Sequence, residues 1–348
     1  MASKDKDGKS KSGSETAVSM KVDSYDKEFL HEALEKMLLI RRFEEKSAQM
    51  YGLRKIGGFC HLYNGQEAVA IAAAMAADMS RDYMLTAYRD HGHAIACGMD
   101  PKVVMAELYG KITGCSRGKG GSMHMFDLEK HMLGGNGIVG AQIPIATGVA
   151  FAEMYKKKVM GEKEAGVALC FFGDGAVHQG AFHESLNLAG VWKLPAVYMV
   201  ENNRFGMGSA VHRVSAVEDF EIKAVGYNMD GMQLNGMSFV ECYEGIGKAI
   251  ERARKDSIPT LIDIKTYRYK GHSMSDPAKY RTKDELEKFK AQDPIELLKA
   301  SMIDAGMLTD EDYQRLDKTI REQVQEAVDF AENSDEPAIE TIYEDIYV

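Results

Sequence analysis

The second half of the chain alternates short apolar runs with amphipathic segments, and this alternation constrains the fold more than any other feature. Apolar runs at Val167–Phe172, Ala196–Val200 and Thr260–Lys265 have the length of buried strands. Segments with helical spacing of apolar residues, Phe182–Trp192 and Phe239–Arg252, separate them. Strands that alternate with helices form parallel sheets covered by helices on both faces. The sequence therefore predicts an α/β fold built on a parallel sheet.

Helical extensions are expected on both sides of this α/β unit. Apolar residues take helical spacing from Tyr25 to about Gly52, and beyond Asp293-Pro294 the chain is amphipathic helix with a short end, Ile339–Val348. Between the first helix and the sheet, the pattern predicts a helix after Gly65, a strand at Tyr83–Thr86, a helix that Pro101 opens at its first turn, and a helix at Gln142–Tyr155.

The stretch Gly110–Gly140 is dense in glycine and low in apolar residues, so it is predicted to be a long functional loop and not a core element. Its end, Gly135–Gly140, matches the dinucleotide-binding pattern G-x-G-x-x-G and precedes a helix. That pattern requires a hydrophobic strand directly before it. Because Glu129–Leu133 makes a poor strand, a nicotinamide or flavin site is disfavoured here.

Residues 1–24 contain mainly Lys, Ser, Gly, Asp and Glu and are predicted to be a disordered tail. Residues 25–348 are expected to form a single domain with a helical C-terminal extension. A mitochondrial import segment is typically Arg-rich and acid-poor, whereas this tail has no Arg and carries Asp5, Asp7, Glu15 and Asp23. We therefore expect a flexible arm, and a cytoplasmic bacterial protein rather than one of the mitochondrial matrix.

Composition narrows the classes of partner. A net charge of −10 argues against nucleic acid or an anionic membrane as the main partner. No apolar run is long enough to span a bilayer. The five cysteines are scattered without a CxxC pair, so neither a zinc site nor a disulfide framework is indicated, and a reducing cytosol fits best.

Polar residues follow two of the predicted strands at their carboxyl ends, where ligands bind in this class of fold. Asp174 lies within Gly173-Asp174-Gly175, and Asn203 ends Glu201-Asn202-Asn203. Each pattern alone is often a turn or a helix cap. At two successive strand ends, however, they bring a carboxylate and an amide together, and Mg²⁺ prefers such oxygen ligands and shares its shell with phosphates. Asp174, Asn203 and a nearby carbonyl could hold Mg²⁺ with two diphosphate oxygens and a water.

This pair of motifs resembles the motif of thiamine-diphosphate enzymes, and longer matches extend the resemblance over nearly the whole chain after the tail. The chain is similar to the alpha subunits of 2-oxo acid dehydrogenases, pyruvate dehydrogenase among them. The resemblance is carried by Phe59–Tyr63, Gly65–Ala68, Ala87–Arg89, Gly118–Met125, Gly134–Gln142, Trp192–Pro195, Glu201–Gly208 and Tyr267–Pro277. It implies the thiamine-diphosphate-binding fold.

Site residues follow from the resemblance position by position. Mg²⁺ would be bound by the side chains of Asp174 and Asn203 and by the main-chain carbonyl of Phe205, where relatives often have Tyr. The resemblance also implies that His61 and His272 line the channel to the reacting carbon and donate protons, because imidazole titrates near neutral pH. The remaining cofactor contacts are implied for Tyr88, Arg89 (on the diphosphate), Gly137 and Val139 (on the aminopyrimidine), Gly175 and Ala176. His178 stands where relatives commonly have Asn, and it receives no role.

The implied activity is decarboxylation of pyruvate, with transfer of the acetyl group to a lipoyl group on dihydrolipoyl transacetylase. In this family the glutamate that activates the cofactor belongs to a separate beta chain, so the expected assembly has two alpha and two beta chains. Acetoin dehydrogenase and branched-chain 2-oxo acid dehydrogenase alpha subunits remain alternatives, as does a non-catalytic scaffold or regulatory homologue that keeps the fold.

The polar loop around His272 is expected to be mobile and to become ordered when the cofactor binds. Its serines, Ser273 and Ser275, resemble positions that mitochondrial relatives use for inhibitory phosphorylation. Without an import signal, we favour the simpler interpretation that they serve as hydrogen-bonding loop residues.

Overall fold

A computed structural model describes residues 20–344 and 346 of the chain. Its centre is a six-stranded sheet in the order β2-β1-β3-β4-β8-β7, and every neighbouring pair is parallel. The strands, in sheet order, are β2 (Met132–Asn136), β1 (Tyr83–Ala87), β3 (Ala168–Gly173), β4 (Ala196–Asn202), β8 (Thr260–Lys265) and β7 (Asp230–Asn235). The predicted parallel sheet is confirmed, and β8 begins and ends at the predicted residues.

The central strands bury both of their faces, which explains why they read as continuous apolar runs. In β3, Leu169 and Phe171 belong to one hydrophobic core, whereas Cys170 and Phe172 belong to a second core on the opposite face. Val197 and Tyr198 of β4 divide in the same way. Successive side chains point to opposite faces of a strand, so each strand contributes to both cores.

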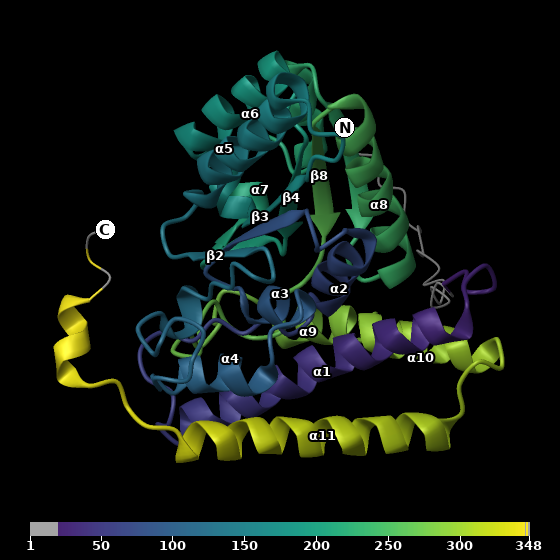
Figure 1. The fold of residues 1–348 in the computed structure, drawn as a ribbon. Coiled ribbons are helices and arrows are strands. Elements are labelled where there is room, and N and C mark those ends of the chain that lie inside the picture. The colour runs from purple at the N-terminus through teal and green to yellow at the C-terminus, as the bar shows by residue number, and fades with distance from the viewer. Residues whose placement is uncertain (1–19, 345, 347–348) are drawn as a thin grey trace, which may run out of the picture.

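Helices cover both faces of the sheet, as predicted (Figure 1). On one face lie α5 (Gln142–Tyr155), α6 (Gly180–Trp192) and the short helix η4 (Phe220–Tyr227). On the other lie α2 (Glu67–Ala76) and α8 (Phe239–Asp256), followed outward by α1 (Lys27–Gly52), α10 (Pro294–Asp304) and α11 (Asp310–Asn333), which lie together at the bottom of Figure 1. The helical extensions thus form one layer beside the sheet.

The remaining elements are short. Asp100 caps the helix that Pro101 opens, because its side chain accepts a hydrogen bond from Lys102 N at 2.8 Å. The other short elements are α3 (His91–Ala96), α4 (Pro101–Leu108), α7 (Val211–Val214), α9 (Lys283–Lys290), η1 (Gly121–Met123), η2 (Lys156–Met160), η3 (Asp174–His178), η5 (Ile339–Tyr343) and the antiparallel pair β5 (Phe205–Gly206) and β6 (Ser209–Ala210). Among the described residues, the helices are all too short or too polar to cross a membrane.

The prediction that Gly110–Gly140 holds no core element is wrong. Its end contains β2, which pairs with β1 and buries Met132 completely. A side chain at Gly135 would collide with the Asp90 carboxylate and the Met123 carbonyl, so the strand needs glycine in order to pack. A strand therefore does precede the G-x-G-x-x-G pattern, but it is the edge strand of the sheet, whereas the dinucleotide pattern belongs to a central strand.

The predicted tail also ends earlier than residue 24. Met20 and Val22 are buried, and the main-chain N–H of Met20 donates to the Ser301 hydroxyl at 3.0 Å. These residues therefore pack against the folded chain. Residues 1–19, the rest of the predicted tail, lie outside the described residues.

Candidate cofactor and metal site

A cavity of about 220 Å³ lies at the carboxyl ends of β1, β3 and β4. It brings together most of the site residues that the sequence predicts. His61 stands at its edge, with its ring 4.7 Å from that of Tyr88. Gly137 is not among the lining residues, although its neighbours Val139 and Gly140 are. The predicted residues on the cavity wall are Tyr88, Arg89, Val139, Asp174, Gly175, Ala176, Asn203, Phe205 and His272.

Sheet topology explains why the proposed metal ligands meet. β3 and β4 are neighbours in register, with Gly173 opposite Glu201, so the residues that follow each strand emerge side by side. Asp174 and Asn203 are both buried. The Asn203 amide group donates from Nδ2 to Gln66 Oε1 at 3.0 Å, which leaves its oxygen, Oδ1, for the cavity. Gln66 thus fixes the orientation that a metal ligand needs.

The contacts of Arg268 show where the oxygen atoms of Asn203 and Phe205 point. Its Nη1 atom lies 3.4 Å from Asn203 Oδ1 and 3.4 Å from the Phe205 carbonyl oxygen. Two of the three proposed ligand atoms therefore converge on one cationic nitrogen. Together with the Asp174 carboxylate they form a donor set of hard oxygens, which fits Mg²⁺. Arg268 lies within the matching segment Tyr267–Pro277, but no role was predicted for it.

Burial raises the pKa of Asp174 to about 6, while the nearby Arg268 charge acts to lower it. Removing a carboxylate from water disfavours its charged form, and a cation bound beside it would restore that form. At neutral pH Asp174 is still mainly ionised. Its environment therefore favours binding of a positive ion.

Arg89 is a second buried arginine among the residues that line the cavity. Its guanidinium donates to the main-chain oxygens of Leu62 and His272, each at 2.7 Å. Burial and the neighbouring Arg268 charge lower the pKa of Arg89 to about 10, which leaves it cationic at neutral pH. Among the described residues, neither arginine forms an ion pair with a carboxylate. Two buried cations without a partner anion make a site for an anionic group such as a diphosphate.

The two predicted histidines lie together, with their rings 5.2 Å apart in an edge-to-face arrangement. Burial, followed by the charge of Arg89, lowers the pKa of His61 to about 2 and that of His272 to about 4. Both imidazoles are therefore neutral at neutral pH, and the expectation that they titrate near neutrality is wrong. The Nδ1 atoms of both rings are buried and have no hydrogen-bond partner among the described residues, which suits a bound ligand.

The loop around His272 is held by Asp276. One oxygen of its carboxylate accepts from the His272 N–H at 2.6 Å and from the Tyr280 hydroxyl at 2.7 Å, and Arg268 donates to that hydroxyl at 2.8 Å. Through Tyr280 and Asp276, the loop is therefore hydrogen-bonded to Arg268, the same arginine that contacts the proposed metal ligands. Its mobility before cofactor binding stays a prediction.

Glu201 is a further cavity residue that the sequence analysis left without a role. It is buried, it accepts a hydrogen bond from the Tyr63 hydroxyl, and one of its oxygens lies 3.3 Å from His93 Nε2. The one sequence feature that could have predicted a site role for Glu201 is its position directly before Asn202-Asn203. Because Glu201, Tyr63 and His93 come from distant parts of the sequence, spacing alone does not connect them.

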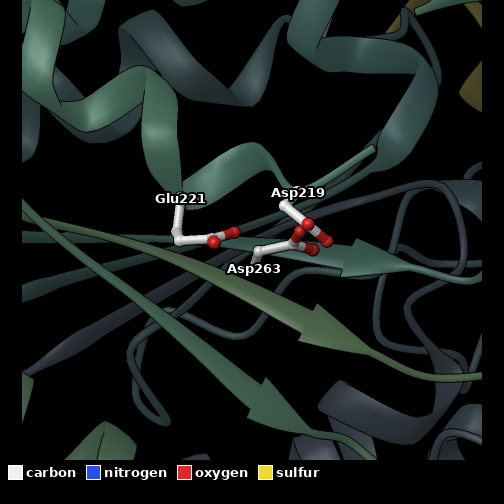
Figure 2. Close-up of side chains that lie close together, drawn as sticks. All are labelled: Asp219, Glu221 and Asp263. Carbon is white, nitrogen blue, oxygen red and sulfur yellow. The ribbon is translucent and has the colours of Figure 1, made fainter. Parts of the chain in front are cut away.

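A larger cleft, of about 870 Å³, opens on the far side of Phe205. Next to it, Asp219, Glu221 and Asp263 gather their carboxylates closely enough to suggest a second metal site (Figure 2). The ammonium group of Lys265, however, lies 2.7 Å from Asp263 and 3.0 Å from Asp219. Since Lys265 already pairs with two of these acids, and since Asp219 is exposed, we assign no metal to this cluster.

The sequence is similar to one family of known proteins. A sequence model of the family described as "Dehydrogenase E1 component" matches residues 35–340. The chain is 49% identical over 312 residues to the pyruvate dehydrogenase E1 component subunit alpha of Rickettsia bellii, covering 90% of this chain and 94% of that protein. It is 48% identical over 326 residues to the protein of the same name from Rhizobium meliloti, covering 93% and 92%. With that of Zymomonas mobilis the identity is 44% over 324 residues, covering 93% and 90%.

Proposed function

The chain belongs to the dehydrogenase E1 component family, and we propose that it is the alpha subunit of a pyruvate dehydrogenase that uses thiamine diphosphate and Mg²⁺. The observation that carries this proposal is the shared cavity of Arg89, Arg268 and the oxygen donors Asp174, Asn203 and Phe205. Buried cations without a partner anion, next to hard oxygen donors, suit a diphosphate bridged to a divalent ion. Residues 25–348 would form one domain of the diphosphate-binding type.

Each wall of the cavity has its own task in this proposal. Arg89 binds the diphosphate through its guanidinium, while Asp174, Asn203 and the Phe205 carbonyl hold Mg²⁺. Gly175 and Ala176 start a short helix beside them, where a small or absent side chain lets the main chain approach phosphate oxygens. Gly137 and Val139 would contact the aminopyrimidine through their main chain.

Thiamine diphosphate, when bound, supplies the electron sink that decarboxylation of a 2-oxo acid requires. The histidines act on the substrate side of the cavity. His61 and His272 each offer a neutral ring with an unpartnered Nδ1, so they can hydrogen-bond to the substrate and hold a proton at that nitrogen. A diphosphate beside Arg89 would offset the charge that lowers the pKa of both rings.

A second polypeptide is part of the proposal, because the glutamate that activates the cofactor is expected on a beta chain. Two features of the surface support it. Ile138 and Val139 are exposed, Val139 on the cavity wall, and the outer surfaces of α5 and α6 expose several large apolar side chains. The assembly would contain two alpha and two beta chains and would act on lipoylated dihydrolipoyl transacetylase. The exposed apolar residues of the two helices are Ile145, Phe151, Tyr155, Leu188, Val191 and Trp192.

Co-expression with a candidate beta chain tests the function, with substrate profiling by a redox dye. We expect turnover of pyruvate by the complex and none by the isolated chain. Preference for acetoin or for branched-chain 2-oxo acids would select one of those alternatives. Turnover by the purified chain, with no second polypeptide on a gel, would contradict the need for a partner. A chain that fails to bind thiamine diphosphate in a Mg²⁺-dependent manner would instead be a scaffold or regulatory homologue. We propose a cytoplasmic location because the relatives named above are bacterial proteins.

A further inference from the structure

Three side chains distant in sequence form a buried chain of hydrogen bonds behind the cofactor cavity. Glu44 of α1 accepts at Oε2 from His91 Nδ1 at 2.9 Å, and His91 Nε2 lies 2.8 Å from the hydroxyl of Ser122. His91 is the first residue of α3, and Ser122 lies in η1. The order Glu-His-Ser and the two short distances are those of a hydrolytic triad.

Burial excludes a hydrolytic role. Glu44 and His91 are fully buried and Ser122 is only 4% exposed, and none of the three lines the cofactor cavity. A nucleophilic hydroxyl must reach its substrate, and this one cannot. Its oxygen also accepts a hydrogen bond from the main-chain N–H of His61 at 3.0 Å. Glu44, His91 and Ser122 therefore form a hydrogen-bonded unit that binds main-chain N–H groups of the protein itself.

The main chain that it holds is the short segment His61–Tyr63. Ser122 binds the N–H of His61 at one end, and Glu44 Oε1 accepts from the N–H of Tyr63 at the other, at 2.8 Å. Between them, the carbonyl of Leu62 accepts from Arg89 at 2.7 Å. His91 connects Glu44 and Ser122, the residues that make the two outer contacts, through its two ring nitrogens. All three residues of the segment are thus fixed by buried polar groups, and the His61 ring is directed towards Tyr88 and His272.

Both ring nitrogens of His91 have a partner in this unit, Glu44 at Nδ1 and Ser122 at Nε2. Burial acts to lower the pKa of His91, but the charge and hydrogen bond of Glu44, with the charge of Asp90, raise it on balance. Both ring nitrogens then donate, one to Glu44 and one to Ser122. The Ser122 hydroxyl then accepts from His91 Nε2 and from the His61 N–H.

We propose that Glu44, His91 and Ser122 are positioning residues that fix the segment His61–Tyr63 and thereby set the place of the His61 imidazole at the cavity. The proposal rests on the proposed function, since it assumes that His61 acts on the bound substrate. Removing the Glu44 charge would loosen this segment without touching any residue of the cavity wall. Misplacement of a reacting group by a fraction of an ångström lowers turnover more than it lowers binding.

The test uses Glu44→Gln in the complex with the beta chain. Glutamine keeps the size and the acceptor for Tyr63 N but presents an amide donor to His91. We expect kcat for pyruvate to fall about tenfold or more, with KM and the affinity for thiamine diphosphate within about twofold of wild type. A crystal structure of the variant complex should show the His61 ring displaced from Tyr88. Glu153→Gln is the matched control, because Glu153 is a buried glutamate that accepts from the Gly166 N–H at 2.8 Å far from this segment.

Wild-type kcat in Glu44→Gln, or equal losses of kcat and cofactor affinity in it and in Glu153→Gln, would overturn the proposal. If Glu44→Gln does not fold, Ser122→Ala decides by the same criteria. The crystal structure of the Glu44→Gln complex, together with the activity of the wild-type complex, distinguishes a failure of this inference from a failure of the proposed function. If the His61 ring is displaced in Glu44→Gln but the wild-type complex does not use pyruvate, the proposed function alone is refuted. If the ring is unmoved and kcat is unchanged in Glu44→Gln while the wild-type complex is active on pyruvate, the positioning role alone is refuted.

Discussion

Arg268 Nη1 lies 3.4 Å from Oδ1 of Asn203, so a guanidinium already contacts an oxygen that is proposed to bind Mg²⁺. The same nitrogen lies equally close to the Phe205 carbonyl. A carbonyl or amide oxygen has two lone pairs and can serve both cations. The two positive charges nevertheless repel each other, and the metal must bind against that repulsion.

Replacing Arg268 by glutamine should therefore strengthen binding of the metal. We expect the affinity for Mn²⁺, followed by electron paramagnetic resonance in the absence of thiamine diphosphate, to rise about fivefold, since a like charge at such a site costs on the order of 1 kcal/mol. Arg281→Gln serves as the control, because Arg281 donates to the main-chain oxygens of Arg268, Tyr269 and Lys270 and not to the proposed ligands. Weaker Mn²⁺ binding in Arg268→Gln would mean that the arginine supports the site more than it opposes the metal.

Asp174→Ala and Asn203→Ala should each abolish Mg²⁺-dependent binding of thiamine diphosphate while the chain stays folded. Either change removes a proposed ligand atom, and the loss of affinity should exceed about 100-fold. Titration calorimetry with and without Mg²⁺ measures it, and circular dichroism checks the fold. Asp219→Ala, in the lysine-neutralised acidic cluster, should bind like wild type. The metal assignment is wrong if either site variant keeps wild-type affinity.

The part of the site that the sequence could predict is the part that topology brings together. Asp174 and Asn203 follow consecutive strands of one parallel sheet, and such strands pair side by side, so their proximity follows from the strand pattern. The same reasoning located β8, in which every residue before Lys265 is buried. The edge strands were missed, since β2 contains two glycines and β7 is half exposed and polar. Edge strands lack the apolar signal that burial on both faces imposes.

The rest could not be predicted because it depends on contacts between distant segments. Gln66 orients Asn203 across 137 residues, and Arg268 reaches the same amide across 65. No local sequence pattern around Gln66 or Arg268 predicts a contact with Asn203. The neutral state of His61 and His272 has the same origin, because burial and the approach of Arg89 lower their pKa values only in the folded chain.

The lowered pKa values of these histidines predict how stability depends on pH. With pKa values of about 2 for His61 and about 4 for His272 in the folded chain, against about 6.5 when unfolded, the unfolded chain binds more protons below pH 6.5. The free energy of unfolding should therefore fall as the pH drops from 6.5 towards 4. Urea titrations of wild type and His272→Gln at a series of pH values measure this, and the fall should be smaller in the variant. Equal falls in both proteins would contradict the lowered pKa of His272.

His272 also offers a test of the acyl-transfer step. Its ring lies edge-to-face with His61 and its unpartnered Nδ1 is free to meet a substrate. If His272 hydrogen-bonds to the lipoyl group, then His272→Ala should suppress reductive acetylation of lipoyl transacetylase more than decarboxylation of pyruvate with an artificial electron acceptor, by about tenfold or more. The two activities are measured on the same preparation of the complex, and Lys270→Ala, in the same loop but outside the cavity wall, provides the control. Should both activities of His272→Ala fall equally, the acyl-transfer role would be withdrawn, and His272 would keep only a contact with the cofactor.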